Sequence, residues 1–395
     1  INVYEGEKLL VEKINIKGNT VTNESVIRGE LLLDEGDPFN FLNLDKSIAR
    51  LKARNIFGEV KKEVIDGSNK SQKIIDISVE EKPTGEISAG AGFGTGGGSF
   101  GFNVSENNWM GKGIKIATNL EANATSLKGE LDVQHQNYNY TGNDLNYFVS
   151  SAQNDKPDSG YKNNIYSSGI GLRFEQFKDV YLSPALSLTH DDLQVEDKAS
   201  ASMKKQEGTF TDLSFDYGIQ LDNRDRAFMP TEGYITSFNQ TIPLYADTPF
   251  IKNAFGYRVY NSFTPNVIGA FKFYTAAING LNDEDVRLSK RISLPGSFLR
   301  GFKAGKIGPK DNDDYVGGNY AMAANFEAAL PNFLPEGTKT DVGLFLDLGN
   351  VWGVDYDNTV GDSNTLRAAT GLNTSWSSPV GPLTFVFAKN LRAAS

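Results

Sequence analysis

Few residues in this chain have the types and spacing that catalysis requires. His135 and His190 are its two histidines, and each lies beside polar residues in a strand-like segment. Residues 90–94 form a glycine-rich run that superficially resembles a nucleotide-binding loop, but no helical pattern follows it. No Cys/His cluster, phosphate-cradling lysine loop or nucleophile elbow is present, and the serines and carboxylates show no spacing typical of a hydrolase. The sequence therefore predicts a protein that is not an enzyme, with no cofactor and no metal.

A charge cluster around Arg300 is the remaining chemical candidate. Arg300 lies in a glycine-rich stretch, residues 297–309, within a connection that is too long for a simple turn. Alternation along the next two predicted strands places Glu327 and Asp347 on their polar faces. If the loop folds back between those strands, charge-assisted hydrogen bonds from Arg300 to both carboxylates would hold it there. An exposed loop with a solvated arginine is equally compatible with these residue types.

The composition indicates a protein built from many strands. Only 39% of the 395 residues are hydrophobic, yet the chain has 16 Tyr, 25 Phe and 40 Gly, which suits strands with aromatic ends and tight turns. No run approaches the roughly 18 apolar residues of a membrane helix, although a transmembrane strand needs only about 10. The net charge of −10 argues against a nucleic-acid partner, and zero cysteines exclude disulfides and thiolate metal sites.

The first 83 residues differ from the rest and predict a small α+β domain. Residues 1–8 read as the remnant of a preceding domain, and residues 9–83 as one complete domain. Thr22 is expected to cap the first of its two helices. The predicted order is strand–helix–helix–strand–strand, over residues 10–16, 24–33, 44–55, 58–65 and 73–80.

Residues 84–395 alternate with the period of strands and predict an all-β transmembrane barrel. Most strands are about ten residues long, and long connections alternate with short ones, as in outer-membrane barrels. A soluble sandwich or propeller is the alternative. Because such barrels have an even number of strands, we expect a sixteenth strand to be missing. The fifteen predicted strands are 86–93, 98–106, 113–123, 128–138, 144–153, 161–176, 179–192, 209–220, 233–242, 252–264, 267–280, 318–330, 339–348, 366–376 and 382–389.

The first predicted barrel strand is unusually poor in side chains on one face. Its inner face carries Ser88, Gly90 and Gly92, whereas the opposite face carries Ile87, Ala89, Ala91 and Phe93. Glycine weakens a strand and offers few cross-strand contacts. The small residues either leave packing room for an internal loop or make a seam that opens, and both interpretations can hold together.

Several motifs resemble those of a known family, the POTRA-plus-barrel superfamily of assembly and translocation proteins. Residues 16–20 fit a POTRA domain, and residues 222–225, 347–352 and 378–383 agree with the barrel in the same order. The similarity covers nearly the whole chain. The signature of the sixth external loop in this superfamily is matched by Leu299, Arg300, Gly301, Phe302, Ile307, Gly308 and Pro309.

This resemblance implies a sixteen-stranded barrel in the bacterial outer membrane, preceded by periplasmic POTRA domains. It implies that loop six enters the lumen and that its arginine pairs with Glu327 and Asp347. It further implies a lateral gate between the first and last strands, with residues 87–93 as the first gate strand, at which client strands pair. The implied partners are unfolded outer-membrane β-barrel clients, accessory assembly lipoproteins and outer-membrane lipids. A two-partner secretion or autotransporter-assembly transporter and a passive porin-like channel remain as alternatives.

Overall fold

A computed structural model describes residues 8–94, 97–227, 229–331, 333–334, 340–355, 360–378 and 381–393. Contacts divide the chain into two compact units. The first contains the residues up to 89 together with 102–120 and 130–148, and the second contains the remainder.

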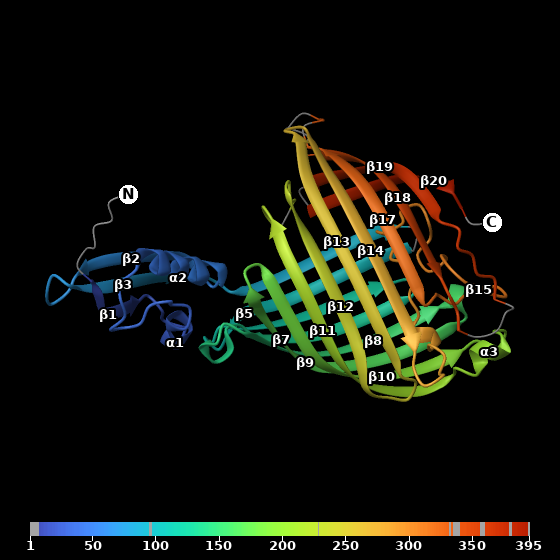
Figure 1. Cartoon of the computed structure of the whole chain (residues 1–395), viewed down its shortest axis with the longest axis horizontal. Coiled ribbons are helices and arrows are strands. Elements are labelled where there is room, and N and C mark those ends of the chain that lie inside the picture. The colour runs from blue at the N-terminus through green and yellow to red at the C-terminus, as the bar shows by residue number, and fades with distance from the viewer. Residues whose placement is uncertain are drawn as a thin grey trace. The chain divides into compact units, whose positions relative to one another are not determined.

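The N-terminal domain has the strand–helix–helix–strand–strand order that the sequence predicts. In its three-stranded sheet β3 is central, parallel to β1 and antiparallel to β2. Figure 1 shows the helices beside this sheet. The elements are β1 (Leu10–Lys17), α1 (Glu24–Arg28), α2 (Phe41–Ala53), β2 (Phe57–Asp66) and β3 (Gln72–Glu81).

One hydrophobic core holds this domain together. The predicted apolar face of α2 is buried, with its side chains at most 7% exposed, and it packs with strand and α1 residues. Burial of each such side chain stabilises the fold by about 1.5–3 kcal/mol. The α2 face is made of Leu44, Ile48 and Leu51, and the core also contains Val11, Ile14, Ile27, Val60, Ile75 and Ile77.

Three details of the helices differ from the sequence prediction. Helix α1 ends at Arg28, five residues earlier than predicted, and its N-cap is Asn23, not Thr22. The Thr22 hydroxyl instead accepts a hydrogen bond from Asn108 at 2.9 Å, so tertiary contact overrides the local capping preference. Helix α2 begins earlier than predicted because the Asn40 side chain accepts from the backbone N–H of Leu42 at 2.8 Å.

Fifteen strands in a single sheet correspond one for one to the fifteen predicted runs. A sandwich or propeller would divide them among several sheets, so the barrel prediction is confirmed. Each strand lies beside its sequence neighbours, with β14 followed by β17 (Figure 1). The strands are β4 (Gly85–Gly94), β5 (Gly97–Trp109), β6 (Ile114–Asn123), β7 (Ser126–His135), β8 (Asp144–Lys156), β9 (Tyr161–Phe177), β10 (Val180–Val195), β11 (Gly208–Arg224), β12 (Gly233–Ala246), β13 (Phe250–Thr264), β14 (Val267–Gly280), β17 (Tyr320–Leu330), β18 (Thr340–Trp352), β19 (Arg367–Ser378) and β20 (Gly381–Arg392).

Side chains along these strands alternate between a covered polar face and an exposed apolar one. In β17, Asn325 is 1% exposed and Phe326 is 47% exposed. In β18, Asp347 is fully buried and Leu346 is 36% exposed. This is the polar-in, apolar-out pattern of a barrel wall. None of the helices within the described residues is both long and apolar enough to cross a bilayer.

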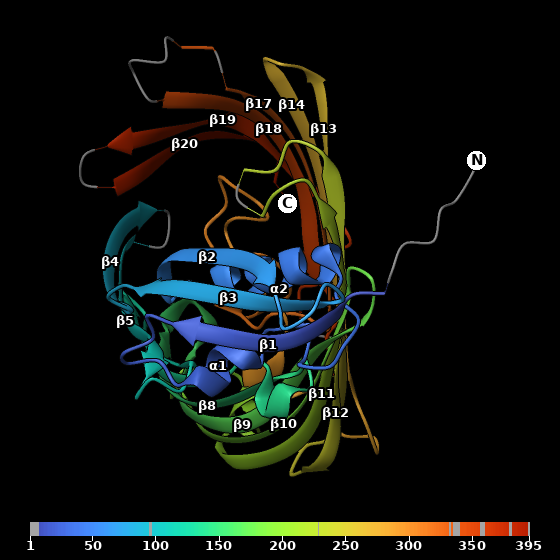
Figure 2. The same cartoon turned by 90° about the vertical axis from the view of Figure 1, so that its left-hand side faces the viewer.

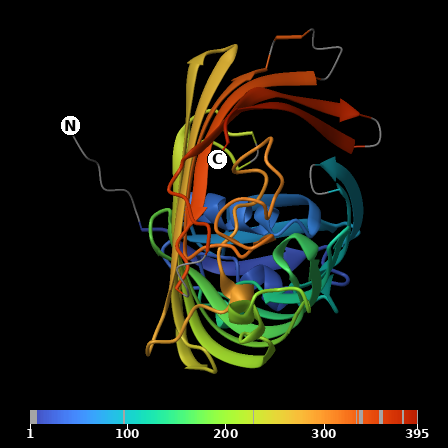
Figure 3. The same ribbon diagram turned by 90° about the vertical axis from the view of Figure 1, so that its right-hand side faces the viewer.

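Residues 281–317, which form most of the connection between β14 and β17, are called the long loop. It lies on the concave side of the curved sheet, as the orange segment in Figure 3. It contains two elements that the sequence analysis did not predict, a short hairpin of β15 (Lys310–Asp311) with β16 (Asp314–Tyr315) and a 3₁₀ turn at Leu288–Lys290. A buried apolar cluster, which includes Ile292, Leu294 and Leu299, fixes the loop against β14, β17 and β18.

The strand order begins at β4 and ends at β20, which are therefore the two edges of the sheet (Figure 2). Edge strands carry unpaired backbone N–H and C=O groups that can accept another strand. Strand β20 also exposes large apolar side chains, with Phe385 49% and Phe387 66% exposed.

Candidate functional site

Arg300 of the long loop lies against both candidate carboxylates. Its Nε and Nη2 donate to the two oxygens of Asp347 at 2.7 and 2.6 Å, and its backbone N–H donates to the same carboxylate at 3.0 Å. Its Nη2 also lies 2.8 Å from Glu327 Oε1. The guanidinium stacks 3.7 Å from the centroid of the Phe345 ring. A bidentate, stacked arginine has one well-defined geometry, which a lysine could not reproduce.

Burial makes the loss of one partner of this cluster far more costly than the loss of a surface ion pair. The Asp347 side chain has no exposed surface, and that of Arg300 is 12% exposed. Charges in such surroundings are screened less than at a surface, and removing either partner would leave an uncompensated buried charge. The loop segment that carries Arg300 is consequently held to β17 and β18.

Two further polar residues complete the cluster and were not singled out from the sequence. Asn325 donates to Asp347 Oδ1 and to the Phe298 carbonyl, each at 2.8 Å, and so joins the strand to the loop. Lys272 on β14 lies 2.7 Å from Glu327 Oε2. Lys272 is opposite Asn325 in the strand register, so period-two alternation across neighbouring strands could have identified it.

The other residues of the loop motif fix its path. Leu299 and Ile307 are at most 2% exposed and belong to the buried apolar cluster, against which Phe302 also packs. Gly301 and Gly308 adopt positive φ angles of 86° and 114°, where any other residue would be strained.

Close approach gives Gly308 a second reason to be glycine. A Cβ on Gly308 would lie 3.0 Å from Val351 on β18. The carbonyl of Pro309 accepts from Val316 N–H at 3.1 Å, which closes the short hairpin of β15 and β16. The motif thus allows the backbone to turn at Gly308 and allows the loop to pack closely against β18 of the barrel wall.

Strand β4 carries the predicted first gate strand, and its side chains are uniformly exposed. Ile87 is 75% exposed and Phe93 96%. A Cβ placed on Gly90 would meet no atom within 4 Å, so no close contact requires a glycine there. The exposed set is Ile87, Ser88, Ala89, Gly90, Ala91, Gly92 and Phe93.

Neither histidine lies in an arrangement typical of a catalytic base. The His135 ring makes an edge-to-face contact with Tyr138, with centroids 5.2 Å apart. His190 Nδ1 lies 3.1 Å from the Thr211 hydroxyl.

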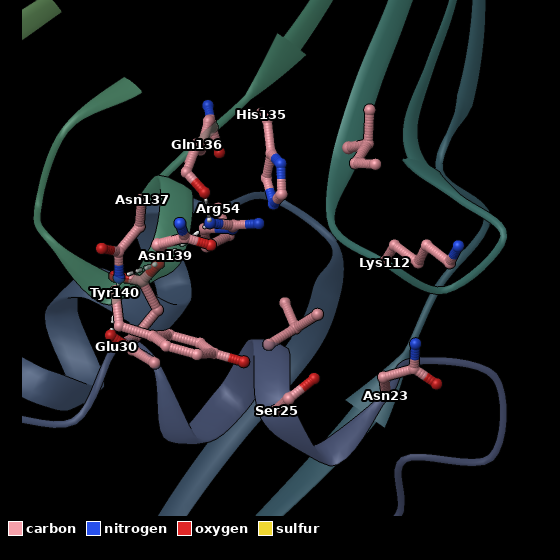
Figure 4. A pocket seen from close by; sticks show the side chains of 13 residues that line it. Asn23, Ser25, Glu30, Arg54, Lys112, His135, Gln136, Asn137, Asn139 and Tyr140 are labelled. Carbon is pink, nitrogen blue, oxygen red and sulfur yellow. Dashed lines mark hydrogen bonds and ion pairs between the residues drawn. The ribbon is translucent and has the colours of Figure 1, made fainter. Parts of the chain in front are cut away.

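The first compact unit contains a second polar centre around Arg54, and sequence reasoning missed it. Arg54 pairs with Glu30 at 2.9 Å, and both side chains are at most 9% exposed. Arg54 also donates to the Gly113 carbonyl at 2.8 Å, and Asn137 donates to the Gly29 carbonyl at 2.6 Å. Figure 4 shows the pocket that Glu30, Arg54 and Asn137 line together with their neighbours. The C-terminal ends of α2 and α1 are thereby connected to the turns that follow β5 and β7, respectively.

Glu81 organises the loop of the N-terminal domain that contacts Asn108. Its carboxylate accepts from the backbone N–H groups of Thr20 and Thr22 at 2.9 and 2.6 Å, and from the Thr20 hydroxyl at 2.6 Å. Burial raises the pKa of Glu81, but these hydrogen bonds outweigh burial and lower the pKa to about 2. The folded protein therefore keeps this carboxylate ionised well below its ordinary pKa of 4.5.

Glu81→Gln should loosen this loop in a pH-dependent way. Because the folded pKa is lowered, the contribution of Glu81 is complete above pH 4.5 and is lost as the pH falls through about 2. At pH 7 the amides of residues 20–22 should exchange hydrogen about tenfold faster in the variant, and the difference should disappear toward pH 2. The exposed neighbour variant Glu80→Gln is the control, and an equal effect there would contradict the role of Glu81.

Comparison with known proteins identifies the family. The sequence profile of the Omp85 superfamily domain matches residues 108–395, and that of POTRA, described as a surface antigen variable number repeat, matches residues 9–82. The chain belongs to the Omp85 superfamily, a class that the barrel and the preceding α+β domain define together.

Two curated relatives match almost the whole chain. The chain is 29% identical to the outer membrane protein assembly factor BamA of Neorickettsia risticii, over 99% of its own length and 54% of that protein. It is 27% identical to BamA of Neisseria meningitidis, over 99% of its length and 55% of that protein. The chain thus spans about half the length of the curated relatives it matches.

Solved structures show the same fold. BamA from Haemophilus ducreyi, in a crystal structure lacking POTRA domains 1–3, matches with a TM-score of 0.83 at 24% identity, over 99% of this chain and 82% of that one. CdiB from Acinetobacter baumannii matches with a TM-score of 0.64 at 12% identity, over 98% of this chain and 71% of that one.

Proposed function

We propose that the chain is the barrel and one POTRA domain of an outer-membrane protein assembly factor. Its barrel spans the bacterial outer membrane, its POTRA domain lies in the periplasm, and it inserts and folds β-barrel proteins into that membrane. The observation that carries the proposal is the edge strand β4, whose residues 87–93 are all exposed in a chain of this superfamily. The names of the curated relatives support the same activity.

The proposed mechanism is strand pairing at a lateral gate between β4 and the last strand. A client strand adds to the edge of β4 through backbone hydrogen bonds, which give affinity with little dependence on the client sequence. An open edge within lipid leaves polar backbone groups unsatisfied, and pairing removes that cost. The process requires no cofactor and no catalytic residue, because edge pairing itself supplies the free energy.

The Arg300 cluster serves this function by holding the long loop in the lumen. It connects the loop to β17 and β18, close to the C-terminal edge of the sheet. The loop therefore keeps this part of the wall in shape while the edges exchange partners. We propose unfolded β-barrel clients and outer-membrane lipids as partners of the barrel, and accessory assembly lipoproteins as partners of the POTRA domain.

Cysteine crosslinking along β4 tests the proposal. The chain has no cysteine, so single cysteines at Ile87, Ala89, Ala91 and Phe93 are each the only thiol. A stalled client carrying one cysteine in its terminal strand should crosslink to at least one of these positions, with a fixed register. The control is Leu172→Cys in β9, which is exposed but lies in a non-edge strand.

Absence of crosslinks along the whole of β4, or equal crosslinking at Leu172, would contradict the proposal. A transporter of the same superfamily would instead crosslink to its cargo from the lumen-facing wall. A passive channel would conduct steadily in planar bilayers and would crosslink to no client.

A further inference from the structure

The start of the long loop has a buried ionic attachment of its own, separate from the Arg300 cluster. Arg287 lies at the beginning of the 3₁₀ turn, and its side chain is 1% exposed. Its Nη2 lies 2.6 Å from Asp212 on β11, and its Nε lies 3.4 Å from Asp191 on β10. Both carboxylates are at most 2% exposed.

Contacts with the surrounding side chains fix the position of the Arg287 guanidinium. Its Nη1 donates to the Thr248 hydroxyl at 3.0 Å, and its guanidinium lies 4.3 Å from the centroid of the Phe210 ring. Ser289, two residues further on, hydrogen-bonds to Asp191. Planar stacking combined with hydrogen bonds in several directions requires a guanidinium, so the site is specific for arginine.

The charges of the cluster around Arg287 balance. Lys290 lies 2.9 Å from Asp212, so two cations meet two carboxylates. Asn163 on β9 donates to Asp191 at 2.8 Å and extends the network to a third strand. A buried carboxylate with its cation removed is strongly unfavourable, so Asp191 cannot lose Arg287 without rearrangement, whereas Asp212 would retain Lys290.

We propose that Arg287 is a second anchor of the long loop, a positioning residue that fixes the start of the loop to β10 and β11 independently of Arg300. Arg300 attaches the middle of the loop to β17 and β18. The loop is therefore connected to two separate parts of the wall. The inference concerns the barrel itself and does not rest on the assembly activity.

The second anchor also stabilises a small apolar cluster, here called the apolar cover, in which the start of the long loop packs against the connection between β10 and β11. Leu288 is 2% exposed and packs with Leu193, Met203 and Val316. Its backbone N–H donates to Gln206 in that connection at 2.7 Å. Releasing Arg287 would loosen this cover, while the Arg300 cluster would keep the middle of the loop in place.

Thiol accessibility in the reconstituted whole chain tests the independence of the two anchors. Leu288→Cys reports on the start of the loop, and Leu299→Cys, which is fully buried beside Arg300, reports on its middle. With Arg287→Met, the thiol at 288 should be alkylated about tenfold faster while the thiol at 299 keeps its rate. With Arg300→Met the pattern should reverse. Lys198→Met removes a cation that is 74% exposed on a neighbouring connection and should change neither rate.

Folding of each variant is checked first, through the resistance of the barrel to dodecyl sulfate at room temperature. If Arg287→Met does not fold, Arg287→Lys decides the question, because an ammonium keeps the charge but cannot contact both carboxylates while stacking on Phe210. The thiol at 288 should again react faster, by a smaller factor. An unchanged rate at 288 in the folded variant would overturn the proposal, as would a joint rise at 288 and 299.

Discussion

Arg300→Ala is expected to release the middle of the long loop and to abolish most client assembly. The substitution leaves Asp347 with no exposed surface and no cation. Breaking a buried pair of this kind costs about 3–5 kcal/mol, several times the worth of a surface ion pair. The loop can avoid that cost only by moving away so that water reaches the carboxylate.

Two observables follow from Arg300→Ala. Assembly of a β-barrel client into vesicles should fall at least about tenfold, since about 1.4 kcal/mol corresponds to a factor of ten and the expected loss is larger. Proteolysis within residues 297–309 should become faster. Arg226→Ala, which removes an arginine that is 57% exposed, should leave both unchanged.

The double variant Arg300→Met with Asp347→Asn distinguishes the effect of an unpaired buried charge from the effect of losing the bidentate contact. It removes the buried charge together with its partner, so it should fold better than Arg300→Ala while still lacking the bidentate contact. If Arg300→Ala assembles clients at the normal rate and its loop stays protected, the cluster does not hold the loop.

Gly18→Ala is expected to destabilise the N-terminal domain by more than about 3 kcal/mol, because strain and a steric clash add. Gly18 has a φ of 92°, which L-residues rarely adopt, and a Cβ there would lie 2.0 Å from the Val79 carbonyl oxygen in β3. A backbone atom in the middle of the sheet cannot move without loss of pairing. The following loop, which Glu81 organises, would be displaced as well.

Gly36→Ala is the matched control for this change. Gly36 has a φ of 97°, but a Cβ there would meet nothing within 4 Å, so only the conformational cost of about 1–2 kcal/mol remains. Hydrogen exchange of β1 and β3 in the whole chain measures both variants. Equal loss of protection in the two would show that the clash at Val79 has no effect.

The strands could be predicted from the sequence because their pattern is local. Period-two alternation and the glycine-containing turns define each of the fifteen strands within a few residues. The hairpin within the long loop was missed because Lys310–Asp311 and Asp314–Tyr315 are too short to alternate. Helix α1 was predicted too long because its pattern continues past Arg28, although the helix ends there with Gly29 as its C-cap.

The polar contacts could be predicted only where partners lie on neighbouring strands. Glu327 and Asp347 were identifiable because both follow the long loop on consecutive strands. Arg287 was not, because its partners on β10 and β11 are set by the path of the loop across the barrel, not by any local pattern. The Arg54 centre depends in the same way on which turn reaches the C-terminal end of α2.

The two loop anchors differ in how far along the chain they reach, and we expect this difference to favour an order of folding. Arg300 and Asp347 are separated by 47 residues, whereas Arg287 and Asp212 are separated by 75. Contacts that close shorter segments form at lower entropic cost and are therefore expected earlier. The hairpin of β17 and β18 can thus capture the loop first. We expect the strands of the N-terminal half to curve afterwards around a loop that is already in place, so that residues 281–317 need not be threaded into a closed lumen.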